Sequence, residues 1–190
     1  MAKLPAKAYK TRTLSPYIMR MSAKFKVLLL NGPRQIGKTT LLKNTKRANQ
    51  KYVSLDNPQD LLLAKTDPKG FLDTYAPPCI IDEIQYAPEL FPYIKMTADN
   101  TEKKALYWLT GSQQYNLMQG VTESLAGRLV IIDMLGFSVY ERDGKGDAQK
   151  PFLPSPEPAR VLRKRNSADT FKIIWQESFP EVASAGSFQA

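Results

Sequence analysis

Short apolar runs alternate along the chain with amphipathic or polar stretches. Apolar runs bounded by turn residues are typical of buried parallel strands, and amphipathic stretches that begin near a proline are typical of helices. Strands that alternate with helices predict an α/β fold with a parallel sheet and right-handed crossovers. We expect strands at residues 26–31, 52–55, 79–82, 105–110 and 128–133, and helices at residues 14–23, 39–47, 58–64, 68–75, 88–98, 114–118 and 122–125.

The pattern changes after the fifth predicted strand. Residues 141–169 are rich in proline, glycine and basic residues, a composition that favours a linker over a packed core. Beyond them, Phe171, Ile174 and Trp175 lie at helical spacing and predict an amphipathic helix. We therefore predict a core over residues 1–140 with a loose basic stretch at 1–13, a linker over 141–169, and this helix within 170–190. Its apolar face packs either on the core or against a further domain.

The first predicted strand leads into a glycine-containing loop that opens a helix. The loop fits the pattern G-x-x-x-x-G-K-[ST], which binds phosphate when it lies between a strand and a helix. Its backbone N–H groups and the helix N-terminus attract anions. The alternative is a glycine turn that precedes a helix by chance. The residues of the loop are Gly32, Pro33, Arg34, Gln35, Ile36, Gly37, Lys38 and Thr39.

Two residue types in this loop point to a magnesium nucleotide. The Lys38 ammonium would reach the β- and γ-phosphates, and the Thr39 hydroxyl would ligate Mg²⁺, which prefers oxygen ligands. The third predicted strand ends in two acids, Asp82 and Glu83. Asp82 would hold Mg²⁺, and Glu83 would act as general base on the attacking water, which favours hydrolysis over phosphate transfer. The alternative is a strand end with solvated acids.

Polar residues also follow the fourth predicted strand. Thr110, Ser112 and Gln113 are candidates to contact the γ-phosphate or the attacking water, and spacing does not separate them. An ordinary polar turn is the alternative.

Arg128 stands at the start of the fifth predicted strand. A buried arginine is costly unless it is paired, so it either pairs with an acid such as Glu123 or Asp133 or stabilises transition-state charge. If Arg128 stabilises transition-state charge, it could act on a nucleotide bound to its own chain or to a neighbouring subunit.

Together these segments resemble an AAA+-type P-loop ATPase. More narrowly, they resemble a prokaryotic group with an N-terminal ATPase core and a C-terminal domain of uncharacterised function. The resemblance covers roughly residues 10–140. It is carried by GPRQIGKTT at 32–40, YVSLD at 52–56, IIDEIQ at 80–85, LTGS at 109–112 and LAGR at 125–128.

The resemblance implies a P-loop NTPase three-layer sandwich with five parallel strands in the order 5-1-4-3-2. It assigns residues 32–40, including Thr40, to nucleotide binding as the Walker A segment, with Lys38 and Thr39 as its main residues. It assigns the acids at 82–83 to Walker B, and Ser112 or Gln113 to a γ-phosphate sensor between the two. Arg128 is a candidate arginine finger.

Members of this group usually run much longer than 190 residues. The segment SFPE at 178–181 resembles the point where their C-terminal domain begins. We therefore expect the chain to be a truncated form, which leaves the function of the missing domain open.

The net charge of +9 is unevenly distributed. Residues 1–50 hold twelve basic and no acidic residues, whereas residues 51–140 hold seven basic and eleven acidic residues. A basic N-terminal third suits a nucleotide or a nucleic acid, although a solvated charged surface is the simpler explanation. The basic residues there that a nucleotide leaves unexplained are Lys3, Lys7, Lys10, Arg12, Arg20, Lys24 and Lys26. A second basic cluster, a weaker hint, comprises Arg160, Arg163, Lys164 and Arg165.

Composition excludes several classes of function. The chain has no histidine, so histidine-based metal sites and catalysis are excluded. Cys79 is the single cysteine, which excludes an intrachain disulfide. No apolar run approaches the roughly 20 residues of a membrane span, and the basic N-terminus lacks the apolar stretch of a signal peptide. We expect a cytoplasmic protein.

The leading hypothesis is a module that binds ATP with Mg²⁺, hydrolyses it, and drives a conformational change in a partner or a C-terminal domain. Three alternatives stay open: a non-hydrolysing ATP switch, a nucleic-acid-binding regulator, and a phosphotransferase. The sequence leaves the oligomeric state, the partner and the biological process open.

Overall fold

The computed structural model describes residues 9–112, 124–142, 144–146, 166–168 and 171. Predicted features at Gln113, at residues 114–118, and at Ile174 and Trp175 lie outside these residues. The elements are α1 (Ser15–Ser22), β1 (Val27–Asn31), α2 (Lys38–Thr45), β2 (Lys51–Ser54), α3 (Pro58–Thr66), α4 (Pro68–Thr74), β3 (Cys79–Asp82), the 3₁₀ helix η1 (Ile84–Tyr86), α5 (Leu90–Asp99), β4 (Tyr107–Gly111), β5 (Leu129–Asp133) and α7 (Val139–Arg142).

The chain divides into two compact units, one of Leu14–Leu135 and one of Met1–Thr13 with Gly136–Ala190. The first unit holds all five strands of the sheet, and α7 belongs to the second. Within the described residues, we find no helix with the length and apolar character that a membrane crossing requires.

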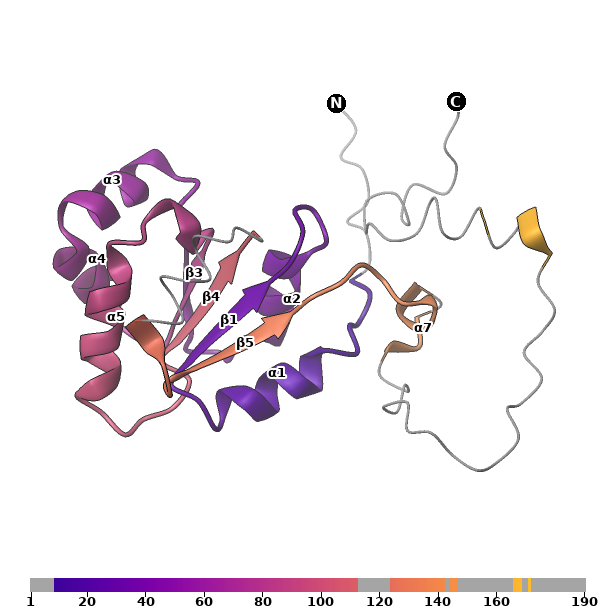
Figure 1. Ribbon diagram of the computed structural model, residues 1–190, viewed down its shortest axis with the longest axis horizontal. Coiled ribbons are helices and arrows are strands. Elements are labelled where there is room, and N and C mark those ends of the chain that lie inside the picture. Colours follow the sequence, from indigo (N-terminus) through magenta and orange to yellow (C-terminus); the bar gives the residue numbers. More distant parts are fainter. Residues whose placement is uncertain (1–8, 113–123, 143, 147–165, 169–170, 172–190) are drawn as a thin grey trace. The chain divides into compact units, whose positions relative to one another are not determined.

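The sheet has the order β2-β3-β4-β1-β5, and every neighbouring pair is parallel. This confirms the predicted order 5-1-4-3-2. β1 lies between β4 and β5, with Val27 opposite both Tyr107 and Leu129. The carboxyl ends of β1, β3 and β4 therefore lie at one edge of the sheet (Figure 1).

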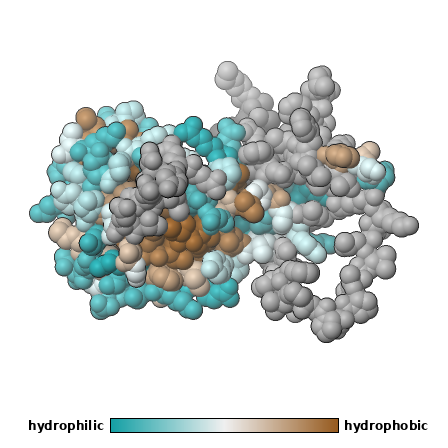
Figure 2. Space-filling view, in the orientation of Figure 1, coloured by the Kyte–Doolittle hydropathy of each residue, from teal (hydrophilic) through white to brown (hydrophobic). Residues whose placement is uncertain are grey.

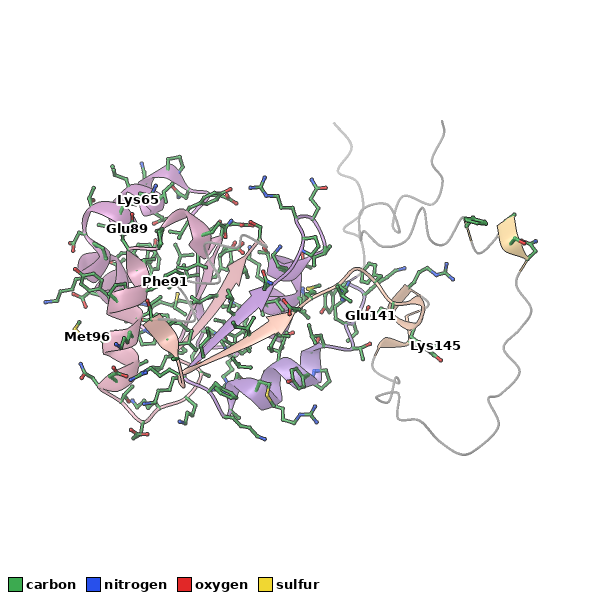
Figure 3. The ribbon with its side chains drawn as sticks, viewed as in Figure 1. Lys65, Glu89, Phe91, Met96, Glu141 and Lys145 are labelled. Carbon is green, nitrogen blue, oxygen red and sulfur yellow. The ribbon has the colours of Figure 1, made fainter. Side chains whose placement is uncertain are left out.

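Helices cover both faces of the sheet, as the three-layer prediction requires (Figure 1). Alternate side chains of β1 point to opposite faces, as they must in a strand. Leu28 and Leu30 join a cluster with residues of α1 and α2, whereas Val27 and Leu29 join a cluster with residues of α3, α4 and α5. Along α5, Phe91 is buried in the second cluster while Met96 points away and is exposed (Figure 3).

β5 is an edge strand of the described sheet. Its first three residues, Leu129, Val130 and Ile131, are each partly exposed, and Figure 2 shows apolar side chains gathered over this strand. Its last two residues, Ile132 and Asp133, are buried and exposed respectively. The strand therefore passes from an apolar edge to a polar end beside the loop that follows β1.

The predicted boundaries of the described elements differ from the observed ones by at most two residues, and those of β3 are identical. α2 ends at Thr45 because Lys46 has extended backbone angles, and β4 begins at Tyr107 rather than at residue 105. The left-handed Ala105 and the bond from Leu106 N to Lys26 O precede that strand. The pattern of apolar residues does not predict such local backbone conformations and hydrogen bonds.

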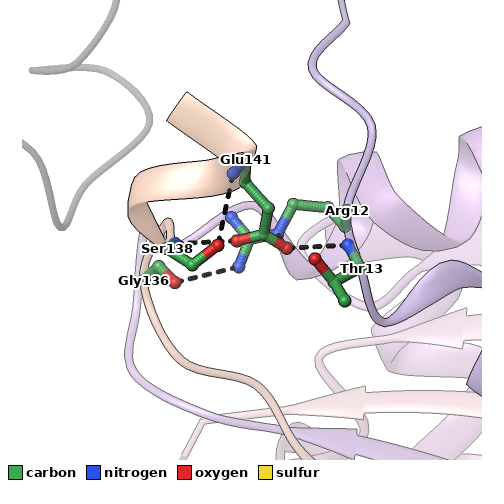
Figure 4. Close-up of polar contacts among 5 residues, drawn as sticks. All are labelled: Arg12, Thr13, Gly136, Ser138 and Glu141. Atoms are coloured by element: carbon green, nitrogen blue, oxygen red, sulfur yellow. Dashed lines mark hydrogen bonds and ion pairs between the residues drawn. The ribbon is translucent and has the colours of Figure 1, made fainter. Parts of the chain in front are cut away.

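In the second unit, a buried ion pair joins residues 9–13 to the segment around α7 (Figure 4). Arg12 Nε lies 3.3 Å from Glu141 Oε1, and both side chains are 6 % exposed. The Glu141 carboxylate also accepts bonds from the backbone N–H groups of Thr13 and Ser138, each at 2.8 Å. The Arg12 guanidinium lies over the Phe137 ring at 4.5 Å. The predicted loose stretch at residues 1–13 therefore does not describe Arg12 and Thr13, because Glu141 supplies a buried partner from far along the sequence.

Candidate nucleotide site at the carboxyl edge of the sheet

The loop between β1 and α2 has the backbone that close contact with an anion requires. Gly37 precedes the helix in the left-handed conformation, with φ of 89°, and Gly32 has φ of 151°. A Cβ atom at Gly32 would lie 2.4 Å from the carbonyl oxygen of Met134, so only glycine fits there. Gln35 is also left-handed, with φ of 62°. Ile36 is 2 % exposed and anchors the loop in the core. Pro33, Arg34 and Gln35 are exposed, as is Thr40.

Lys38 is held inside this loop by its own backbone. Its ammonium donates to the carbonyl oxygens of Gly32 and Pro33, at 2.9 and 2.7 Å. Burial lowers the pKa of Lys38, while the nearby Glu83 and Asp82 carboxylates oppose that shift. The Lys38 ammonium is thus held by the carbonyl groups of the loop, and Asp82 and Glu83 are the acids near it.

Asp82 joins three elements through hydroxyl groups. At the end of β3 and 4 % exposed, its carboxylate accepts from Thr39 Oγ1 at 2.9–3.0 Å, from Tyr52 OH at 2.8 Å and from the hydroxyl of Thr110. Thr39 lies in the first turn of α2, Tyr52 lies on β2 and Thr110 lies on β4. A buried carboxylate needs such donors, since an unpaired buried charge is costly. The structure thus brings together Thr39 and Asp82, the two predicted Mg²⁺ ligands.

Glu83 follows Asp82 in a left-handed conformation, with φ of 57°. Its backbone N–H donates to Thr110 Oγ1 at 3.1 Å, and its carboxylate accepts from the side-chain amide of Gln85. The left-handed turn takes the chain out of the strand direction at Glu83.

Ser112 follows β4 and is 6 % exposed. Its Oγ is buried and has no hydrogen-bond partner among the described residues. The register places Gly111 opposite Asn31, the last residue of β1 before the loop. Ser112 therefore lies at the loop edge of the sheet with an unused hydroxyl group. The other sensor candidates differ: Thr110 is fully bonded to Asp82 and Glu83, and Gln113 lies outside the described residues.

Arg128 does not join this group. It directly precedes β5, and β5 runs parallel to β1, so Arg128 lies at the amino edge of the sheet, away from the loop. Its side chain pairs with Asp99 at the end of α5 and donates to the carbonyl oxygen of Ala126 at 2.8 Å. The predicted partner Asp133 instead accepts from Asn31, and Glu123 lies outside the described residues. Residue spacing did not indicate Asp99, because the partner comes from a helix that the fold places beside β5.

Two polar contacts at this edge were missed by sequence reasoning. Tyr52 was assigned only to a strand, yet its hydroxyl bonds Asp82, and the Lys43 ammonium lies 3.7 Å from the centre of its ring. Burial and the bond to Asp82 raise the pKa of Tyr52, so the hydroxyl stays a proton donor at neutral pH. Asn31 donates to Asp133 Oδ1 at 2.7 Å, which ties the end of β1 to the end of β5. Tyr52 reaches Asp82 because β2 lies next to β3 in the sheet. The expected strand order was therefore the one feature of the sequence analysis that could have predicted this contact.

The donor set suits a hard divalent cation such as Mg²⁺. Thr39 offers a hydroxyl oxygen and Asp82 a carboxylate, both of the oxygen type that Mg²⁺ binds. Among the described residues, no group of three or more His, Cys, Asp or Glu could hold a metal. A two-ligand protein site is what Mg²⁺ uses when phosphates and water complete its shell.

Comparison with known proteins agrees with this arrangement. The AAA domain family matches residues 24–142, which span every strand and the whole candidate site. The chain belongs to the AAA domain family. This confirms the resemblance to an AAA+-type P-loop ATPase.

Two curated relatives match this AAA domain over 179 residues at 32 % identity. They are the uncharacterized proteins Rv2008c of Mycobacterium tuberculosis and Mb2031c of Mycobacterium bovis. The match covers 94 % of this chain and 40 % of each relative, so the chain spans less than half the length of the curated relatives it matches.

Similar solved structures include a DNA replication initiation factor, with a TM-score of 0.40 and 17 % identity over 63 % of this chain and 45 % of that one. Saccharomyces cerevisiae RIF2 has a TM-score of 0.46 and 12 % identity over 70 % and 58 % of the two chains. A Thermotoga maritima RUVB variant has a TM-score of 0.39 and 22 % identity over 68 % and 44 %.

Proposed function

We propose that this AAA domain binds ATP at the carboxyl edge of its sheet and hydrolyses it with Mg²⁺. The observation that carries the proposal is the bond between Thr39 and Asp82, because it joins the phosphate-binding loop to the acidic end of β3. An ATPase needs both parts within reach of one phosphate group. The family membership of the chain supports the same reading.

Each residue has a distinct task in this proposal. The backbone N–H groups of the loop and the Lys38 ammonium would neutralise the phosphates. Thr39 and Asp82 would hold Mg²⁺, which supplies positive charge against the phosphate oxygens. Thr39 would then give up its present bond to Asp82, while Tyr52 and Thr110 continue to orient that carboxylate.

Glu83 is the proposed general base. A carboxylate of a water-positioning residue accepts the proton of the attacking water, a role worth roughly 10²–10⁴-fold in rate. Its position directly after Asp82, where its backbone N–H donates to Thr110 Oγ1 at 3.1 Å, supports the assignment. Ser112, with its buried and unbonded hydroxyl, is the proposed γ-phosphate sensor.

A second candidate function is a switch that binds ATP without hydrolysing it. The contact between Gln85 and the Glu83 carboxylate favours it, since the amide occupies an oxygen that would otherwise accept the proton of the attacking water. The two functions differ in turnover, so phosphate release under conditions of saturating nucleotide distinguishes them.

Arg128 keeps one proposed catalytic role, as a residue donated to the nucleotide of a neighbouring copy. Its position at the amino edge leaves no such role within its own chain. A specific ATPase rate that rises with protein concentration, and that loses this rise in Arg128→Ala, would support donation between copies. A rate per molecule that is independent of concentration would contradict it.

In this proposal, the energy of ATP hydrolysis would drive a conformational change in a partner or in a further domain. We place the module in the cytoplasm, consistent with a single buried and unpaired cysteine.

A further inference from the structure

A second polar hollow lies at the opposite, amino edge of the same sheet. Its volume is about 640 Å³, within the range of small-ligand sites. Its walls come from the end of α5 and from the segments that lead into β2, β3 and β4. Among its lining residues are the cations Arg47, Lys103 and Lys104 and the polar Asn49, Asn100 and Thr101. No acidic and no aromatic side chain is among the lining residues.

Basic residues near this edge differ in their contacts with the protein. Four are tied to protein groups: Lys26 to Ala98 O and Glu102, Lys46 to Gln50 O, Lys51 to Thr74 O, and Arg128 to Asp99. The three cations of the hollow have no side-chain hydrogen bond or ion pair to any described residue. The three cations that surround the hollow are thus available to a ligand.

Three like charges around one concave surface repel one another, and a concave wall focuses their positive potential. A bound polyanion relieves that repulsion. Arginine and lysine with asparagine and threonine are also the side chains that most often contact the phosphates and sugars of nucleic acids. A single carboxylate carries one negative charge, so it would balance only one of the three cations.

We propose that this hollow binds the phosphate backbone of a nucleic-acid strand. Since no aromatic side chain lines it, bases have no platform for stacking, and binding is insensitive to base sequence. The site lies away from the nucleotide loop and differs from the basic residues 3–26. It uses Arg47, Lys103 and Lys104, so it requires neither ATP nor hydrolysis.

The test compares two variants of equal net charge. In one, Arg47, Lys103 and Lys104 are all replaced by Gln. In the matched control, Lys65, Lys69 and Lys95 are replaced by Gln; these lysines are exposed on α3, α4 and α5, and Figure 3 shows Lys65 on the outer side of α3. Binding of a labelled single-stranded oligonucleotide of mixed sequence is measured by fluorescence anisotropy between 50 and 200 mM salt.

We expect the 190-residue chain to bind the oligonucleotide with an affinity that falls linearly on a log–log plot against salt. The hollow variant should lose about tenfold or more in affinity at low salt, and its salt slope should fall by about two to three. The control variant should keep the slope of the unaltered chain. Equal losses in both variants, salt-insensitive binding, or no binding by the unaltered chain would overturn the proposal.

Fluorescent ATP binding and thermal unfolding are measured on the same three proteins. Unchanged ATP affinity and unfolding midpoints in the hollow variant show that any loss belongs to the hollow. Failure of ATP binding in the unaltered chain would instead count against the proposed function and leave the oligonucleotide result standing.

Discussion

At the scale of single residues, Asp82 organises the site. Its carboxylate accepts hydroxyl groups from Thr39, Tyr52 and Thr110, which come from a loop helix and two neighbouring strands. Because these donors leave little freedom for the side chain, the carboxylate is oriented before any ligand arrives. Preorganisation of this kind lets binding energy go to the ligand rather than to ordering the protein.

We predict that the Tyr52 hydroxyl strengthens the binding of Mg²⁺, and that it has little effect on nucleotide binding in the absence of Mg²⁺. Tyr52→Phe removes one charged hydrogen bond to Asp82, worth about 1–2 kcal/mol, or roughly fivefold to thirtyfold. The Mg²⁺ concentration needed for half-maximal nucleotide affinity should rise by that factor, as measured by fluorescent nucleotide titration at a series of Mg²⁺ concentrations.

Tyr75→Phe is the matched control, since the Tyr75 hydroxyl donates to Asp60 at 2.6 Å on the α3 and α4 side of the sheet. It should leave the Mg²⁺ dependence unchanged. If both variants shift the Mg²⁺ dependence equally, or neither does, Tyr52 has no positioning role.

At the scale of elements, the loop between β1 and α2 depends on the segment after β5. The Met134 carbonyl lies where a Cβ of residue 32 would stand, and Met134 N donates to Asn31 O at 2.8 Å. The loop is therefore shaped by a strand that comes about a hundred residues later. Glycine is therefore required at position 32 for two reasons: its positive φ, and the lack of space for a Cβ atom next to the Met134 carbonyl.

Gly32→Ala should weaken nucleotide binding by tenfold or more and destabilise the fold by about 1–3 kcal/mol, because the methyl group meets backbone that has no room to yield. Nucleotide titration and urea unfolding measure the two effects. Gly127→Ala is the control: its φ is 74°, but a Cβ there meets nothing within 4 Å. It should cost about 1 kcal/mol and leave nucleotide affinity unchanged. Equal nucleotide affinity in both variants would contradict the account of the loop.

Cys79 on β3 is predicted to report global unfolding. Burial raises the pKa of its thiol to about 12, above the ordinary value of 9.0. The folded thiol therefore stays protonated and unreactive at pH 8, whereas a reactive fraction of the unfolded thiol is ionised at that pH. The unfolded state loses its proton first, so stability falls as pH rises from about 9 toward 12.

Labelling of Cys79 with a thiol reagent at pH 8 should thus follow the urea unfolding curve. Fast labelling without denaturant would contradict the burial of β3.

The elements show what the sequence could and could not predict. Apolar runs located all five strands, because a buried parallel strand needs continuous apolar residues, and the family resemblance supplied their order. The loop motif located Lys38 and Thr39, and the two acids at the end of the third apolar run located Asp82 and Glu83. Contacts between distant segments were not predictable from spacing: Tyr52 reaches Asp82, and Arg128 reaches Asp99, only because the sheet places them side by side.

At the scale of the whole molecule, each of the two units has its own polar anchor. In the unit of Met1–Thr13 and Gly136–Ala190, Glu141 binds Arg12 and two backbone N–H groups. Burial lowers the pKa of Arg12 and Glu141 opposes that shift, so the pair is a charged interaction in a water-poor setting. Removing one partner of such a pair costs about 3–5 kcal/mol, since the other charge is left buried.

Glu141→Ala should accelerate hydrogen exchange at the amides of Thr13 and Ser138, which both donate to the lost carboxylate. Glu102→Ala is the control, because its side chain is 93 % exposed in a surface pair with Lys26, and such pairs contribute under about 1 kcal/mol. Unchanged exchange in Glu141→Ala would show that the ion pair does not hold the two segments together.

The family places this chain among AAA domains, and its curated relatives are more than twice its length. Our central claim is narrower: the residues at the carboxyl edge of the sheet form a working ATPase site. The claim requires that Glu83 be needed for ATP hydrolysis but not for ATP binding.

Phosphate release from Mg·ATP by the 190-residue chain, with Glu83→Gln and Lys38→Ala beside it, tests this claim most directly. Each protein is also titrated with fluorescent ATP. We predict that the unaltered chain turns over, that Glu83→Gln binds ATP but loses about 10²-fold or more in rate, and that Lys38→Ala loses binding. Turnover in Glu83→Gln equal to that of the unaltered chain, or ATP binding that survives Lys38→Ala undiminished, would contradict the account.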